Sequence, residues 1–242
     1  MIQVDLNEKY IINPAYKFRS DIKRVVVTNN NSLYVNNYDH NDDNFTKNFS
    51  TILHPLVAYL FSFFDGKSSL KDTIQMLSDT LDISEDKVLE TFIMYIENED
   101  KIIYRMSEKY IALIPKNFII KKGKLKERNL LEGINIDEIL NIGVDMDTIR
   151  YYIPNEITLM ITNKCLTDCV YCYANTKPTI KTPLSFERIT EIVKEAHLLG
   201  CRSVELAGGD IFTYKNWYEV IELLNKYEYS PYISTKIPIT EK

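Results

Sequence analysis

The spacing of apolar residues changes along the chain, and the first half is dominated by helical spacing. Apolar residues recur every three or four positions over 53–64, 70–81 and 88–96, which predicts three helices, the first beginning near Ser50. Pro55 is tolerated in the first turn, Asp65-Gly66 ends that helix, and serines stand where the next two need N-caps. β-Type runs at 25–27, 101–106 and 110–114 surround the helices, and the last two predict a β-wing. Three helices and a wing predict a winged-helix-like α+β domain within residues 1–120.

The pattern after residue 156 alternates between strands and helices, with Ser185 as an N-cap and Gly200 as a stop. We expect strands at 157–162, 202–207 and 232–237 and helices at 185–199 and 213–227. Such β-α-β-α-β alternation predicts an α/β domain over 156–242 with a parallel sheet, whose functional groups lie at the carboxyl ends of the strands. Residues 121–155 lack a sustained period, and we interpret them as a linker with a basic stretch at 121–128 and one helix around 136–142.

Composition and charge narrow the classes of function. The chain has 242 residues, 45% of them hydrophobic and 26% charged, with a net charge of −5, as in an ordinary globular protein. The third helix carries Glu and Asp with a single Lys, so phosphates would repel it and no nucleic-acid partner is expected. No apolar stretch is long enough for a membrane helix, and the opening residues MIQVDLNEKYIINP do not form a signal peptide. We therefore expect a cytoplasmic protein that does not contact a membrane.

The cysteines are the most specific chemical signal. Of four, Cys165, Cys169 and Cys172 lie within eight residues, directly after an expected strand. In a cytoplasmic chain this cluster favours metal binding over a disulfide framework. Three thiolates on an iron–sulfur cubane leave one iron with an open coordination position, whereas a structural zinc site would need a fourth ligand such as Cys201 or His197. Cys201 is expected at the opposite end of the sheet, which argues against the zinc alternative.

The loop Cys165-Leu-Thr-Asp-Cys169-Val-Tyr-Cys172 resembles the C-x3-C-x2-C signature of the radical S-adenosylmethionine superfamily, including the aromatic residue before the last cysteine. The resemblance implies that Cys165, Cys169 and Cys172 bind a [4Fe–4S] cluster. It also implies that S-adenosylmethionine chelates the fourth iron and is cleaved to a 5′-deoxyadenosyl radical. The backbone around Tyr171 would then lie near the adenine.

A second motif, Gly208-Gly209-Asp210, follows the next expected strand. It resembles the superfamily's Gly-Gly-Glu-Pro motif, whose acid accepts hydrogen bonds from the methionyl ammonium group. Asp replaces Glu here and Ile211 replaces Pro, so the carboxylate reaches less far. The two glycines would let the backbone approach the cofactor. Ser234, at the end of the third expected strand, is a further candidate for a cofactor contact, and Thr235 beside it is another.

The segment that begins HPLVAYLFSFFDGKSSL is similar to leader-peptide recognition domains, such as the peptide-binding protein of the pyrroloquinoline quinone pathway. These domains bind precursor peptides by adding a strand to a sheet edge. Residues 17–27 supply the candidate strand. Lys17, Arg19, Lys23 and Arg24 either attract an acidic leader or form a solvated strand face.

Together the two resemblances imply a radical peptide maturase, which abstracts hydrogen from a precursor peptide and leaves a thioether or carbon–carbon crosslink. The superfamily's partial barrel has more β-α units than this sequence provides before Lys242. We therefore expect a truncated protein or one completed by another chain. The alternative is a non-catalytic peptide-binding module whose cysteine loop is vestigial or holds a structural metal.

Overall fold

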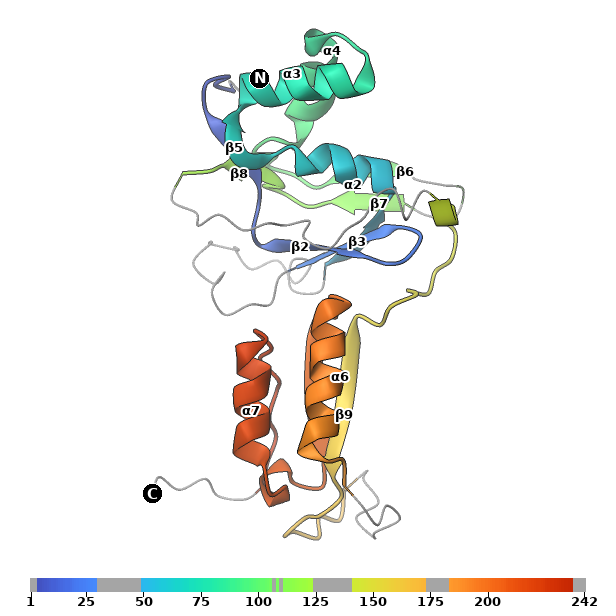
Figure 1. The fold of residues 1–242 in the computed structure, drawn as a ribbon, viewed down its shortest axis with the longest axis vertical. Helices are drawn as coiled ribbons and strands as arrows, with labels where there is room; N and C mark the ends of the chain where they lie inside the picture. Colours follow the sequence, from blue (N-terminus) through green and yellow to red (C-terminus); the bar gives the residue numbers. More distant parts are fainter. Residues whose placement is uncertain are drawn as a thin grey trace. The chain divides into compact units, whose positions relative to one another are not determined.

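The computed structural model describes residues 4–29, 49–105, 108, 111–123, 141–172 and 183–236. The chain forms two compact units, and the boundary between them falls between Tyr152 and Ile153. Figure 1 shows the N-terminal unit in blue to yellow-green and the C-terminal unit in yellow to red. Both units mix helices and strands, so the expected combination of α and β structure is confirmed. Of the helix expected around 136–142, the structure describes only residues 141 and 142, which are helical, and most of the basic stretch 121–128 lies outside the described residues.

In its described residues, the N-terminal unit contains three small antiparallel sheets and the α-helices α2, α3 and α4. Its sheets have the strand orders β2-β3-β4, β5-β1-β8 and β6-β7. Its strands are β1 (Lys9–Ile12), β2 (Tyr16–Ser20), β3 (Val25–Asn29), β4 (Ser50–Leu53), β5 (Asp65–Ser69), β6 (Ile102–Arg105), β7 (Ile111–Ile114) and β8 (Ile119–Lys121). Its helices are α2 (Pro55–Ser62), α3 (Leu70–Leu81), α4 (Glu85–Phe92) and the 3-10 turn η2 (Ile93–Tyr95). The three expected helices and the hairpin β6–β7 are therefore present.

The helix starts follow from capping. The Ser69 hydroxyl accepts a hydrogen bond from Asp72 N at the start of α3, and Ser84 does the same for Lys87 N in α4. The first helix begins later than predicted, at Pro55 with His54 as its N-cap. Residues 50–53 instead form β4, because the β-branched Thr51 and Ile52 pair with β3. The expectation of a helix starting near Ser50 is therefore wrong.

Aromatic side chains fill the core of this unit. Phe61 of α2 makes edge-to-face contacts with Phe92, Tyr95 and Phe118, with ring centroids 5.0–6.0 Å apart. Tyr16 of β2 packs against Phe118 from the sheet side. One face of the sheet β2-β3-β4 thus joins the helical core.

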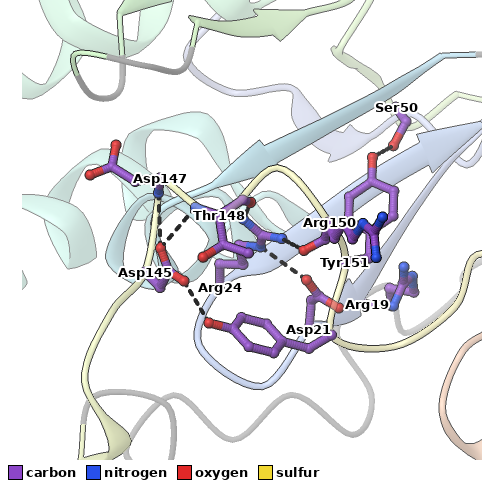
Figure 2. Close-up of polar contacts among 10 residues, drawn as sticks. Arg19, Asp21, Arg24, Ser50, Asp145, Asp147, Thr148, Arg150 and Tyr151 are labelled. Carbon is purple, nitrogen blue, oxygen red and sulfur yellow. Dashed lines mark hydrogen bonds and ion pairs between the residues drawn. The ribbon is translucent and has the colours of Figure 1, made fainter.

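A buried charge cluster lies at the turn between β2 and β3 (Figure 2). The Arg24 side chain is fully buried and donates from Nε to Asp21 Oδ2 over 2.9 Å. It also donates to two backbone carbonyls, that of Thr148 and that of Arg150, the latter over 2.7 Å. We call Asp21, Arg24 and residues 145–152 the Arg24 clamp. The clamp ties a segment that the sequence assigned to a linker firmly into the N-terminal unit.

Aromatic and acidic side chains complete the clamp. The Arg24 guanidinium lies over the rings of Tyr151 and Tyr152, and the Tyr151 hydroxyl is 2.5 Å from Ser50 Oγ. Asp145 accepts from the backbone N–H of Asp147 and Thr148 and from the Tyr152 hydroxyl. Hydrogen bonds from the side chains of Thr148 and Tyr152 and from these backbone groups hold the pKa of Asp145 well below its usual range.

The C-terminal unit contains a β-α-β unit and a second helix, as predicted. Strands β9 (Glu156–Thr162) and β10 (Ser203–Gly208) pair in parallel, with α6 (Phe186–Leu198) between them in the chain. The 3-10 turn η3 (Ile211–Thr213) and α7 (Trp217–Lys226) follow. The last helix starts later than residue 213, because Asp210 caps the 3-10 turn. Leu159, Ile161 and Val204 pack with apolar residues of both helices to form the core.

The third strand expected at 232–237 is not formed over its described part, residues 232–236. Side-chain hydrogen bonds to Glu205 of β10 and to Asp210 just after it hold this segment, in place of backbone pairing between strands. Tyr232 N donates to Glu205 Oε2 over 2.8 Å, and Thr235 Oγ1 donates to Asp210 Oδ2 over 2.5 Å. Pro231 also lacks an N–H for a ladder bond. Within the described parts of the chain, no helix is long and apolar enough to cross a membrane.

Candidate metal and cofactor site

The two loops singled out from the sequence meet at one edge of the C-terminal sheet. β9 ends at Thr162, three residues before Cys165, and β10 ends at Gly208, the first residue of the Gly-Gly-Asp motif. The register pairs Gly208 with Thr162. Because the strands are parallel, both loops leave from their carboxyl ends, as predicted.

The two glycines allow the backbones of these loops to touch. Gly209 N donates to Thr162 O over 2.9 Å, and Asp210 N donates to Lys164 O over 2.7 Å. A Cβ atom on Gly208 would overlap the Thr162 carbonyl oxygen, and one on Gly209 would overlap that of Lys164. Glycine is therefore needed at both positions for a close approach to the segment that leads into the cysteines.

Asp210 is buried, with 3% of its surface exposed, and both of its carboxylate oxygens have partners within the chain. Oδ1 accepts from Phe212 N over 3.1 Å, and Oδ2 accepts from the Thr235 hydroxyl. The carboxylate thereby holds the segment that carries Ser234, whose own side chain is exposed, beside the end of β10. Sequence analysis missed this role of Thr235 in anchoring the segment.

The cysteine loop itself is open. Cys165 and Cys169 are half-buried, Cys172 is exposed, and all three are reduced cysteines outside any disulfide. A turn links the last two, with Cys172 N donating to Cys169 O over 2.9 Å. The apolar side chains of the loop point outward: Leu166 is 77% exposed and Tyr171 72%. Over the ranges that the structure describes, no three His, Cys, Asp or Glu side chains are gathered closely enough to hold a metal ion.

One hydroxyl connects two of the thiols. Thr167 Oγ1 lies 3.2 Å from Cys165 Sγ and 3.5 Å from Cys169 Sγ. Both sulfur atoms therefore contact the same oxygen. Sequence analysis did not single out Thr167, although a hydroxyl residue between two cysteines of a metal-binding signature was a visible cue.

The fourth cysteine lies elsewhere. Cys201 is buried at 2% exposure, and its thiol donates to Pro154 O over 3.1 Å. It precedes β10, so the length of a six-residue strand, about 20 Å, separates it from the edge where the cysteine loop begins. His197 packs against the ring of Tyr227 near the end of α6. Neither residue completes a zinc site with the cysteine loop.

The donor chemistry of the loop suits an iron–sulfur cluster. Three thiols on one short loop supply the ligands of a cubane with one open iron. Two of the three, Cys165 and Cys169, already lie beside a common hydroxyl.

A family model described as the Radical SAM superfamily matches residues 159–240. Residues 159–240 are thus similar to this superfamily. The resemblance drawn from the cysteine loop is therefore confirmed, and the matched range contains both the three cysteines and the Gly-Gly-Asp motif. The superfamily uses a [4Fe–4S] cluster and S-adenosylmethionine.

Relatives extend the comparison beyond the radical SAM domain. Sporulation killing factor maturation protein SkfB of Bacillus subtilis is 28% identical over 90 residues, which cover 37% of this chain and 21% of SkfB. Two solved structures of SuiB from Streptococcus suis, one bound to S-adenosylmethionine and one to the precursor peptide SuiA, share the fold with TM-scores of 0.52 and 0.51. Each is 12% identical, and each alignment covers 96% of this chain and 44% of SuiB. The chain thus spans less than half the length of these relatives.

Proposed function

We propose that this chain is a radical S-adenosylmethionine enzyme, or the N-terminal part of one, that modifies a ribosomally made precursor peptide. The observation that carries the proposal is the three-cysteine loop at the carboxyl edge of two parallel strands, beside a Gly-Gly-Asp loop, within the segment matched by the superfamily. The product would be a thioether or a carbon–carbon crosslink. The two described strands would be the first of a partial barrel.

The chain's residues divide into cluster ligands and groups beside the cofactor. Cys165, Cys169 and Cys172 would hold a [4Fe–4S] cluster. The backbone around Tyr171, the Gly208–Asp210 loop and Ser234 would border S-adenosylmethionine. When bound, the cluster and S-adenosylmethionine would together supply a 5′-deoxyadenosyl radical. Asp210 would contribute by fixing the segment that carries Ser234, since both of its oxygens already accept hydrogen bonds.

The N-terminal unit would recognise the leader of the peptide. Support comes from its three helices and hairpin, which fit the expected winged-helix-like domain, and from the precursor peptide in the related SuiB structure. The clamp changes how recognition would work, because Arg19 and Arg24 are buried beside Asp21 and beneath Tyr151. These two cations therefore form neither a solvated face nor a site for an acidic leader. For residues 17–27 this leaves main-chain pairing along β2, which lies at an edge of the described sheet β2-β3-β4, and the partly exposed Lys17 and Lys23 as routes to a leader.

A reducing compartment suits this assignment. Four free thiols, three of them at least partly accessible, are typical of a cytoplasmic protein. The proposal therefore includes a cytoplasmic location.

Electron paramagnetic resonance on the anaerobically reconstituted and reduced protein tests the enzyme assignment. We expect a [4Fe–4S]⁺ signal that changes when S-adenosylmethionine is added, and its loss in Cys165→Ala. Cys201→Ala is the matched control, since this thiol lies at the other end of β10 and should leave the signal intact. A cluster signal that ignores S-adenosylmethionine would favour the non-catalytic peptide-binding module. Bound zinc without a cluster would overturn the assignment.

A further inference from the structure

The hydroxyl of Thr167 occupies a distinctive position on the cysteine loop. It is half-buried and lies 3.2 Å from Cys165 Sγ and 3.5 Å from Cys169 Sγ. A threonine hydroxyl has one hydrogen to donate, and a thiolate sulfur can only accept it. Here Cys169 Sγ donates to Thr167 Oγ1. Once the cysteines are deprotonated as metal ligands, the single Thr167 hydroxyl hydrogen must be donated to sulfur, to the nearer Cys165 Sγ or shared between Cys165 Sγ and Cys169 Sγ.

Neighbouring hydroxyls are committed to the backbone, which sets Thr167 apart. Thr213 Oγ1 lies within 3.0 Å of both the Lys164 and the Asp210 carbonyl oxygens, and Thr162 Oγ1 accepts from Lys164 N. These contacts hold the Gly-Gly-Asp loop against the start of the cysteine loop. In the described part of the cysteine loop, by contrast, both contacts of the Thr167 hydroxyl are to sulfur.

A hydrogen bond to a ligating sulfur affects the reduction potential of an iron–sulfur cluster. Reduction adds negative charge to the cluster and its thiolates, so a donor at the sulfur stabilises the reduced state more than the oxidised state. Removing the donor should therefore make reduction less favourable. Groups that orient and polarise the ligands in this way matter nearly as much as the ligands themselves.

We propose that Thr167 is a positioning residue that raises the reduction potential of the cluster by donating its one hydroxyl hydrogen to Cys165 Sγ, or to Cys165 Sγ and Cys169 Sγ together. The inference rests on the proposed function, because it requires a cluster on this loop. It assigns Thr167 a role in how readily the cluster accepts the electron, distinct from the binding of S-adenosylmethionine.

The test is a redox titration of the reconstituted full chain without S-adenosylmethionine, followed by electron paramagnetic resonance, on Thr167→Val and Thr167→Ser. Valine keeps the shape and removes the donor, whereas serine keeps the donor. We expect Thr167→Val to lower the equilibrium constant for cluster reduction by up to about tenfold, which is about 59 mV for a one-electron couple. Thr167→Ser should stay close to the wild type. Thr190→Val is the matched control, since that hydroxyl donates to Phe186 O on α6.

Each result has a clear meaning once iron and sulfide contents show how much cluster each variant holds. A fully loaded Thr167→Val with an unchanged potential would overturn the inference while leaving the proposed function intact. Equal shifts in Thr167→Val and Thr167→Ser would also overturn it, because packing would then be the cause. If Thr167→Val takes up no cluster, Thr167→Ala gives the donor-free potential instead. A wild-type chain that binds no cluster would overturn both proposals.

Discussion

The Arg24 clamp and the cysteine loop both gather reactive or polar side chains, yet their surroundings differ. In the clamp, the Arg24 and Asp21 side chains are fully buried, and the guanidinium donates to a carboxylate and two backbone carbonyls (Figure 2). In the loop, Cys172 is exposed, and the other two thiols are half-buried beside one hydroxyl.

This is the difference expected between polar groups that stabilise the fold and the proposed ligand-binding groups of the cysteine loop. A buried charge is tolerated when the chain itself supplies the partners, and for Arg24 these are Asp21 in the same turn and two carbonyls from residues more than a hundred positions away. The cysteine loop leaves its thiols accessible, while the rigid part of the site lies behind it in the contacts between Gly209, Asp210 and the 162–164 backbone. A cluster site needs thiols that the cluster can reach, carried by a backbone that the neighbouring loops hold in place.

Breaking the clamp should have the largest effect on stability. Arg24→Met removes the cation that bonds Asp21 most closely and leaves the buried carboxylate with Arg19 alone, 3.6 Å away, which should destabilise the N-terminal unit by about 3 kcal/mol. Hydrogen exchange measured on peptides from β2 and β3 would report this loss separately from the C-terminal unit. Arg188→Met is the control, because the Arg188–Glu191 pair is exposed and should contribute little.

A double variant distinguishes the buried charge from simple loss of packing. Arg24→Met combined with Asp21→Asn removes both charges of the 2.9 Å pair and leaves Arg19 without its carboxylate partner, so the double variant should be less destabilising than the sum of the two single variants. If the double variant is as unstable as the sum of both single variants, the ion pair is not the source of the effect. Unchanged exchange in β2 and β3 of Arg24→Met would show that the clamp is dispensable.

Adding a side-chain atom between the Gly-Gly-Asp loop and the backbone at Lys164 should have an intermediate effect on the stability of the C-terminal unit. Gly209→Ala places a Cβ against the Lys164 carbonyl oxygen, and relieving that overlap should cost about 1–3 kcal/mol in the C-terminal unit. Hydrogen exchange in β9 and β10 would measure it. Ala207→Ser adds an atom two residues earlier on β10 and should be tolerated, since Ala207 is only half-buried. Equal exchange in wild type and Gly209→Ala would contradict the close approach of the two loops.

The sequence predicted the loop far better than the clamp, for physical reasons. Helices α3 and α4 are defined by local capping serines and helical spacing, and the strand–helix alternation placed both special loops at one sheet edge. The clamp depends on Arg24 reaching carbonyls of residues 148 and 150, and no local pattern encodes that contact. β4 was missed for the same reason, since its pairing with β3 outweighs the apolar spacing that continues into α2.

The smallest predicted effect on stability concerns His54. Its side chain is partly buried, between the fully buried Arg24 clamp and the exposed Cys172 of the cysteine loop. Its Nδ1 accepts from Leu56 N at the start of α2, and partial burial lowers the pKa of His54 below its ordinary value of 6.5. The unfolded chain then binds the proton more readily, so the stabilisation is present above the ordinary pKa and is lost as the pH falls below it. We expect α2 to lose about 1 kcal/mol or less between pH ~7.5 and pH ~5, measured by hydrogen exchange corrected for intrinsic rates. His54→Asn keeps a capping acceptor that does not titrate and should abolish this loss, whereas His197→Gln should preserve it. A pH dependence of α2 that survives in His54→Asn would assign the titration to another group.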